Sequence, residues 1–152
     1  MNKESKEIRY CILVADDDPD DQYMIREALS SSGSDRDICM VSDGEELLEF
    51  LTGTGKYKGK DLPVPLVILL DLNMPKKDGR ECLREIKSTP GLKRIPIVVF
   101  STSNNREDVT YSYEAGAASY ITKPYSYNEL VATMEIFKQY WFKTVKTPGQ
   151  IT

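Results

Sequence analysis

Five carboxylates lie within six residues near the N-terminus, in the run DDDPDD that extends from Asp16 to Asp21. They directly follow the apolar run CILVA (Cys11–Ala15), which is typical of a buried strand. Carboxylates this close repel one another, and the repulsion raises their pKa values. A hard divalent cation such as Mg²⁺ cancels this charge, because it prefers oxygen ligands and combines carboxylates with water and phosphate.

Three further apolar runs end at residues suited to phosphate chemistry. Asp71 follows PLVILL, Ser101 and Thr102 stand at the end of IPIVVFS, and Lys123 follows ASYIT. The Asp71 carboxylate can attack phosphorus. Lys123 offers a positive charge to phosphate oxygens and Ser101 a hydrogen-bond donor, with Thr102 as a second hydroxyl. The set predicts a phosphoryl-transfer site that works by positioning and charge neutralisation.

These groups meet only if the strands before them run parallel in one sheet. Apolar runs and helix-like segments alternate five times, which is typical of an open α/β sheet with helices on both faces and right-handed crossovers. In such sheets a ligand binds beyond the carboxyl ends of the strands. The strands are expected at Tyr10–Ala15, Asp37–Ser42, Pro65–Leu70, Ile95–Ser101 and Ala118–Thr122.

Helix start signals follow the expected strands. Asn105 precedes a polar helix that ends at Gly116. Capping-box spacing occurs at three places, Ser42–Glu45, Asp78–Glu81 and Ser126–Glu129. These signals place a helix after each of the last four strands.

The five acids of DDDPDD divide into two groups. Asp18 is an N-cap aspartate, because a proline follows it at the first helical position. The helix dipole favours anions in the first turn by about 0.3–1 kcal/mol each at low salt. Asp18, Asp20 and Asp21 are therefore assigned to the helix start, and Asp16 and Asp17 to the metal cluster.

Length and composition restrict the class of protein. The 152 residues suit one domain, and a net charge of −4 argues against a nucleic-acid surface. No apolar run approaches the ~18 residues that cross a bilayer, and the charged start MNKESKEIRY lacks the apolar segment of a signal peptide. Three scattered cysteines indicate a reducing compartment, so we expect a cytoplasmic protein without membrane or nucleic-acid partners. The absence of histidine excludes a Ser–His triad, a His-ligated zinc site and a phosphohistidine on this chain.

Four pieces of the sequence, ILVADDD, VILLDLNMPKKDG, VVFSTSN and AGAASYITKPY, together resemble the receiver domain of two-component response regulators. The resemblance implies a flavodoxin-like five-stranded parallel sheet of order 2-1-3-4-5. We expect the receiver domain at residues 8–144, between an N-terminal tail at 1–7 and a C-terminal tail at 145–152. No output domain follows in the sequence, so a stand-alone receiver is expected. The long Gly53–Pro65 loop and the aromatic QYWF near the end also resemble phytochrome-associated single-domain response regulators.

The same resemblance implies a metal site and a phospho-acceptor. Asp71 matches the residue that is phosphorylated, and Asp17 and Asp71 match the carboxylates that bind Mg²⁺ directly. Asp16 matches the acid that acts through water, and Asn73 matches the residue whose backbone carbonyl is a ligand. A sensor histidine kinase or a histidine phosphotransfer protein is the implied phosphoryl donor. The chain is then a phospho-acceptor that assists only its own phosphorylation and dephosphorylation.

A conformational switch is implied as well. Ser101 matches the switch hydroxyl, Tyr120 the switch aromatic and Lys123 the lysine that faces phosphate. On phosphorylation Ser101 is expected to move toward the phosphoryl group and Tyr120 to turn inward. In this family the bond corresponding to Lys123–Pro124 is usually cis.

The last expected helix carries apolar residues on two sides. Those with the spacing of a core face are Leu130, Met134, Phe137 and Trp141. Those outside it are Ile136, Tyr140 and Phe142. Exposed apolar area of this kind favours a homodimer interface, unless the C-terminal segment folds back over it.

Two other functions remain open. A phosphatase of the haloacid-dehalogenase type also uses an aspartyl phosphate and an Asp-x-Asp motif, which Asp16 and Asp18 can mimic. Such an enzyme needs acidic metal ligands after the lysine strand, where only Glu129 and Glu135 occur, both within a helix. The second is an unphosphorylated pseudo-receiver scaffold, but such proteins usually lose the acidic pair or the lysine, which this chain keeps.

Overall fold

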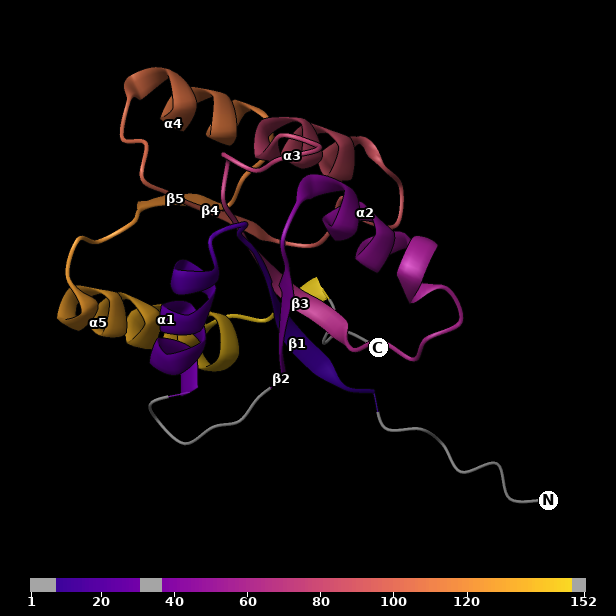
Figure 1. Cartoon of the computed structure of the whole chain (residues 1–152), viewed down its shortest axis with the longest axis horizontal. Helices are drawn as coiled ribbons and strands as arrows, with labels where there is room; N and C mark the ends of the chain where they lie inside the picture. Colours follow the sequence, from indigo (N-terminus) through magenta and orange to yellow (C-terminus); the bar gives the residue numbers. More distant parts are fainter. Residues whose placement is uncertain (1–7, 31–36, 149–152) are drawn as a thin grey trace.

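Five parallel strands form one sheet in the order β2–β1–β3–β4–β5, in a computed structural model that describes residues 8–30 and 37–148 (Figure 1). This is the strand order predicted for a flavodoxin-like sheet, and the prediction is confirmed. The strands are β1 (Tyr10–Ala15), β2 (Asp37–Val41), β3 (Val64–Leu70), β4 (Ile97–Ser101) and β5 (Ser119–Thr122). The helices are α1 (Pro19–Ser30), α2 (Gly44–Thr52), α3 (Gly79–Ser88), α4 (Arg106–Glu114) and α5 (Tyr127–Lys138).

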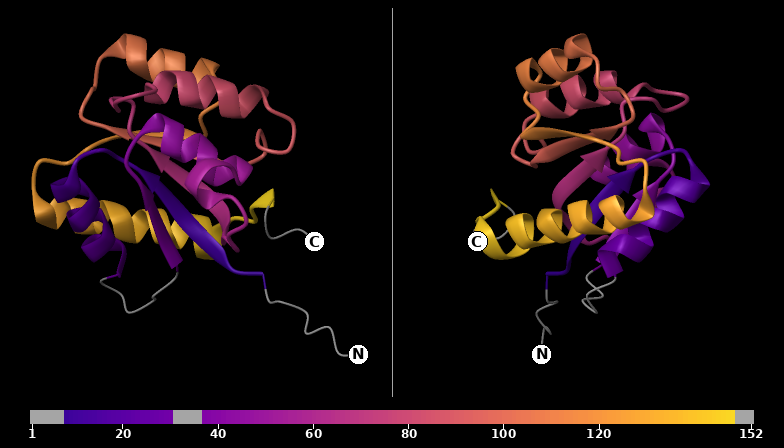
Figure 2. Two further views of the ribbon diagram at one scale, coloured as in Figure 1. Left: turned by 45° about the vertical axis from the view of Figure 1, so that its right-hand side comes forward. Right: turned by 90° about the vertical axis from the view of Figure 1, so that its left-hand side faces the viewer.

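Helices cover both faces of the sheet, as predicted (Figures 1 and 2). Successive strand residues point to opposite faces, so Leu13 and Ile68 pack with α2 and α3. Val14 and Leu69 pack with α1 and α5 on the other face. α4 lies beside α3 near β5 and buries only Ser112 among its own residues. The helices cross over between parallel strands, so the polar residues at the strand ends meet at one edge of the sheet.

The strand boundaries lie within two residues of the predicted ones. β1 has the predicted bounds, and β3 begins one residue earlier, at Val64. β4 begins only at Ile97, because the Ile95 amide donates to the Leu92 carbonyl in a preceding turn. β2 ends at Val41, because the next amide, that of Ser42, donates to a side chain of α2.

Three of the predicted helix caps are confirmed. Asp78, Asn105 and Ser126 each accept a hydrogen bond from a backbone amide in the first turn of their helix. The capping-box prediction for Ser42–Glu45 is wrong by one residue, since Asp43 caps α2 by accepting from an amide 2.8 Å away. Aspartate and serine are equally good caps, so the sequence does not choose between neighbouring candidates.

The Gly53–Pro65 loop is attached to α2 through a short 3₁₀ helix, Gly55–Tyr57. The Tyr57 ring meets the Phe50 ring edge-on at 5.2 Å, and its hydroxyl donates to Glu46 Oε2 at 2.8 Å. Burial, together with the hydrogen bond to Glu46, raises the pKa of Tyr57. The tyrosine thus anchors the loop to the rest of the domain.

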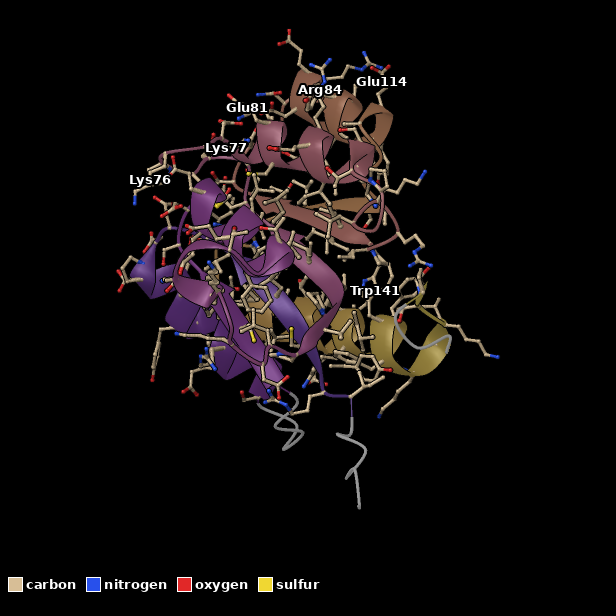
Figure 3. All side chains as sticks on the ribbon, turned by 90° about the vertical axis from the view of Figure 1, so that its right-hand side faces the viewer. Lys76, Lys77, Glu81, Arg84, Glu114 and Trp141 are labelled. Atoms are coloured by element: carbon tan, nitrogen blue, oxygen red, sulfur yellow. The ribbon has the colours of Figure 1, made fainter. Side chains whose placement is uncertain are left out.

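The C-terminal part packs against α1 and the sheet. The buried Lys138 donates from Nζ to the Leu29 carbonyl of α1 at 2.8 Å, and a π-helical turn, Gln139–Thr144, follows. Trp141 lies beside the end of α5 and is 9% exposed (Figure 3). Of the residues predicted to be exposed, Ile136 is 70% and Tyr140 48% exposed. None of the described helices is long and apolar enough to span a bilayer.

Candidate functional site

Three carboxylates meet at the carboxyl edge of the sheet. β1 and β3 are adjacent and parallel, and Ala15 pairs with Leu70 at their ends. The residues that follow, Asp16 and Asp71, therefore leave the sheet side by side. Ligand oxygens of Asp16, Asp17 and Asp71 all lie within 4.8 Å of one another. The sequence analysis predicted this trio.

The environment of the trio favours a bound cation. Asp16 is 1% and Asp71 7% exposed, whereas Asp17 faces solvent. Burial raises the pKa of Asp16 to about 6, although hydrogen bonds from Lys123 and the Asp18 amide oppose it. Burial also raises the pKa of Asp71 against the charge of Lys123. Two buried carboxylates and an exposed third fit a hard divalent cation that keeps water ligands on its solvent side.

Lys123 binds three carboxylates at once. Its Nζ atom lies 2.7 Å from Asp16 Oδ2, 2.8 Å from Asp21 Oδ2 and 3.2 Å from Asp71 Oδ2. Burial opposes its charge, but hydrogen bonds with Asp16 and Asp21 outweigh burial and raise the pKa of Lys123. One ammonium group cannot neutralise three carboxylates, so the cluster retains negative charge that a metal ion can offset.

Asp21 belongs to this site, although the sequence analysis assigned it only to the helix start. Its neighbour Asp18 does act as the N-cap of α1, accepting from the Asp20 amide at 2.8 Å. Asp21 instead turns toward Lys123. The signal that could have found it is helical spacing, because Asp21 stands one turn before the buried Ile25 and so shares its inward face.

The hydroxyl residues at the end of β4 occupy different environments. Ser101 is fully buried, and its Oγ accepts from the Ser103 amide at 3.3 Å. The Lys123 amide donates to the Ser101 carbonyl at 2.8 Å, so the ends of β4 and β5 are joined beside the acidic cluster. Thr102 is exposed. Of the two hydroxyl residues at the end of β4, Ser101 is therefore the one that lies in the interior.

Tyr120 is already turned inward in this structure. Its side chain is half-buried against the apolar layer of α2 and α3. Its hydroxyl donates to the Ser103 carbonyl at 2.6 Å. The structure thus shows the inward position that was expected after phosphorylation, with Tyr120 bound to the loop after β4.

Two expectations from the resemblance concern backbone groups. The Asn73 amide donates to Asp71 Oδ1 at 3.2 Å, so Asn73 lies beside the acidic cluster, and its side chain is exposed. The bond at the position of Lys123–Pro124 is usually cis in the family that the sequence resembles, but no described peptide bond of this chain is cis. The two isomers before proline differ by only about 0.5–1 kcal/mol, so the residue types do not decide between them.

The acids that a phosphatase would need lie elsewhere. Glu129 is exposed in the first turn of α5, and Glu135 forms an ion pair with Lys138 of the same helix at 3.4 Å. Among the described residues, the candidate metal cluster contains neither of them. The carboxylate arrangement thus disfavours the haloacid-dehalogenase alternative.

Comparisons with known proteins agree with this geometry. Residues 12–135 match the response regulator receiver domain. Response regulator Rcp1 from Synechocystis sp. is 41% identical over 138 residues, which cover 91% of this chain and 92% of Rcp1. The structure of the phosphorylated cyanobacterial phytochrome response regulator RcpA is 39% identical with a TM-score of 0.85, covering 93% of this chain and 99% of RcpA. The Mn²⁺-bound form of Rcp1 is 41% identical with a TM-score of 0.83, covering 91% of this chain and 98% of that one.

The relatives also agree with the more specific resemblance drawn from the sequence. Rcp1 and RcpA match nearly the whole of this chain, and RcpA is by name a phytochrome response regulator. The acids, hydroxyl and lysine that carried the resemblance stand at the ends of β1, β3, β4 and β5. This chain belongs to the receiver domain family of two-component response regulators.

Proposed function

We propose that Asp71 accepts a phosphoryl group from a histidine kinase or a histidine phosphotransfer protein, and that Mg²⁺ bound by Asp16, Asp17 and Asp71 is required. The observation that carries the proposal is the position of Asp71. Its carboxylate is close to two further acids and 3.2 Å from Lys123 Nζ. The phosphorylated state of RcpA and the Mn²⁺-bound form of Rcp1 lend support from similar proteins.

The transfer step is a displacement at phosphorus. A carboxylate oxygen of Asp71 forms the new P–O bond while the P–N bond to the partner's imidazole breaks, and the nitrogen keeps the electron pair. Lys123 holds Asp71 in place and can follow the phosphoryl oxygens with its charge. Mg²⁺, when bound, supplies positive charge to the acids and to the phosphoryl oxygens. No other group on the chain has to act as acid or base.

Phosphorylation then acts as a switch. It adds negative charge next to Lys123 and the buried Ser101, and it favours whichever conformation satisfies the added oxygens best. The residue proposed to respond to phosphorylation is Tyr120, whose inward position is held by the hydrogen bond that its hydroxyl donates to the Ser103 carbonyl. The altered surface lies around β5, which contains Tyr120, and the adjacent α4.

Two aspects of the partners belong to the same proposal. The likeness to RcpA supports a sensor kinase of the phytochrome class as the phosphoryl donor. The exposed Ile136 of α5 and Tyr140 of the π-helical turn that follows support a homodimer through this part of the surface. The cytoplasmic location and the 8–144 domain limits remain predictions from the sequence.

Acetyl phosphate with Mg²⁺, followed by intact-protein mass spectrometry, tests the phosphorylation. We expect a single phosphoryl adduct on the wild type, none on Asp71→Asn, and an unchanged adduct on Asp20→Asn, which changes an exposed acid of α1. If turnover is fast, binding of beryllofluoride with Mg²⁺ replaces the adduct as the readout. An adduct that persists in Asp71→Asn, or a wild type that takes up neither group, contradicts the proposal.

A further inference from the structure

Asp108, in the first turn of α4, forms a two-point ion pair with Arg80 of α3. Arg80 Nε lies 2.8 Å from Asp108 Oδ1, and Arg80 Nη2 lies 2.9 Å from Asp108 Oδ2. The Asp108 side chain is 14% exposed and that of Arg80 30% exposed. Paired, parallel hydrogen bonds of this kind fix geometry as well as adding energy. The pair therefore sets the position of the start of α4 relative to α3.

The same carboxylate holds the loop between β4 and α4. Ser103 Oγ donates to Asp108 Oδ2 at 2.6 Å, while the carbonyl of Ser103 accepts from the Tyr120 hydroxyl at 2.6 Å. Ser103 is thus bound from two sides, through its hydroxyl by α4 and through its carbonyl by β5. The carbonyl can receive Tyr120 only while the loop keeps this conformation.

Arg80 also contacts the loop that follows Asp71. Its Nη1 atom lies 3.2 Å from Asp78 Oδ2 and 3.5 Å from Asn73 Oδ1. On the other side, the Tyr111 hydroxyl of α4 donates to the Arg80 carbonyl at 3.2 Å. One guanidinium group therefore connects the loop that follows β3 with the first turn of α4 and, through Asp108, with the loop that follows β4. Figure 3 shows α3 and α4 packed together, with Glu81 and Arg84 on the outer surface.

Arg80 and Asp108 are both charged at neutral pH. Hydrogen bonds from Arg80 and Ser103 lower the pKa of Asp108 to about 2. The hydrogen bond to Asp108 raises the pKa of Arg80, although burial acts in the other direction. Both groups thus remain ionised whether or not Asp71 carries a phosphoryl group.

We infer that Arg80 and Asp108 are positioning residues for the switch: their ion pair holds Ser103 so that its carbonyl binds Tyr120, which biases the unphosphorylated chain toward the inward state. This inference deepens the proposed function and rests on it. If phosphorylation favours the inward state, then by linkage a group that favours the same state in advance tightens phosphoryl binding. Loss of the pair therefore has to weaken both the inward position of Tyr120 and the response to phosphate.

The first measurement follows Tyr120 without any phosphoryl group. The nine tyrosines are replaced by 3-fluorotyrosine, and the Tyr120 fluorine resonance is identified as the one missing from Tyr120→Phe. In Asp108→Ala we expect this resonance to shift toward that of free fluorotyrosine, and its relaxation by a soluble gadolinium chelate to rise at least about twofold. Glu107→Ala is the matched control, because it removes the neighbouring acid of the same helix turn. It leaves in place both hydrogen bonds of Ser103, the one with Asp108 and the one with Tyr120.

The second measurement uses beryllofluoride with Mg²⁺ as the phosphoryl mimic. Asp108→Ala is expected to need roughly five times more of the mimic than the wild type, the lower end of usual coupling between sites. The mimic should restore the inward fluorine shift at saturation. A purely structural role for the pair would lower stability but leave the shift and the saturation curve unchanged.

The outcomes separate this inference from the proposed function. If the wild type binds no mimic, the proposed function fails, while the fluorine measurement still decides the role of the pair. If the Tyr120 resonance of Asp108→Ala matches that of the wild type, the inference is wrong even when the mimic binds. Should Asp108→Ala not fold, Arg80→Lys decides the matter, because it keeps the charge and loses the two-point contact.

Discussion

At the scale of single residues, the site depends on an imbalance of charge. Lys123 faces three carboxylates, and Asp17 adds a fourth that is open to solvent. Coulomb repulsion inside the fold is therefore only partly cancelled until a cation arrives. The residues proposed to sense the phosphoryl group are thus held in an arrangement whose stability depends on what is bound.

Asp108 gives a pH prediction at this scale. Its pKa in the folded state, about 2, lies below its ordinary 3.8. A lowered carboxylate pKa contributes stability above pH 4 and loses it as the pH falls toward 2. We expect the wild type to lose about 1 kcal/mol more than Asp108→Asn over that range, a value kept small because water screens the partly exposed group. Urea unfolding at a series of pH values measures it.

Glu107→Gln provides the control for this pH effect, since Glu107 shares the first turn of α4 and its substitution leaves the bonds of Asp108 to Arg80 and Ser103 in place. A wild type and an Asp108→Asn variant whose stabilities run parallel from pH 4 to pH 2 would contradict the assignment.

The positions of site residues could be predicted from the sequence where those residues stand at the end of a strand. Asp16, Asp17, Asp71, Ser101 and Lys123 each stand directly after or at the end of an apolar run, so parallel strands bring them together. Partners made by packing between helices were not predictable. The contact of Arg80 with Asp108 joins residues 28 positions apart on two helix surfaces, and nothing in the spacing of charges indicates it.

At the scale of elements, two glycines set how closely helices approach the loop after β3. A Cβ atom on Gly79, the first residue of α3, would lie 2.2 Å from the Asp71 carbonyl oxygen. A Cβ atom on Gly44, the first residue of α2, would lie 2.1 Å from the Lys77 carbonyl oxygen. Glycine is needed at both positions because backbone, not a mobile side chain, stands in the way.

Gly79→Ala is therefore expected to damage the metal site as well as the fold. Forcing a methyl group into this contact costs about 1–3 kcal/mol, and α3 must move away from the backbone of Asp71. We predict lower stability in urea and at least severalfold weaker Mn²⁺ binding, measured by electron paramagnetic resonance.

Gly44→Ala is the matched variant, because it creates an equally close contact that involves Lys77 instead of Asp71. It should lose similar stability and bind Mn²⁺ nearly as well as the wild type. Equal loss of metal affinity in both variants would mean that general destabilisation, and not displacement of Asp71, is responsible.

Most boundaries of helices and strands could be predicted from local signals in the sequence. The apolar runs predict the strands because burial on both faces demands continuous apolar side chains, and the caps at Asp78, Asn105 and Ser126 act locally. The π-helical turn Gln139–Thr144 has no such local signal. Its bonding pattern accompanies the packing of Trp141 against the sheet, which depends on the whole fold.

At the scale of the whole molecule, an apolar area at the C-terminal end of α5 remains outside both cores. Ile136 of α5 and Tyr140 of the π-helical turn are exposed, whereas Phe142 and Val145 pack against the layer formed with α1. The described part of the C-terminal segment thus turns inward, with Thr147 1% exposed. It leaves Ile136 and Tyr140 uncovered.

A homodimer through this face gives the last prediction. Burying these two side chains against a second copy removes apolar area from water at both symmetry-related positions, at about 25 cal/mol for each Å². Replacing Ile136 and Tyr140 together with serine is expected to raise the dimer dissociation constant at least about tenfold in sedimentation velocity. Tyr113→Ser is the control, because Tyr113 is 50% exposed but lies on α4. A wild type that sediments as a monomer at high concentration would contradict the homodimer. A dimer lost only in Tyr113→Ser would place the interface at α4, because Ile136 and Tyr140 would then contribute no association energy.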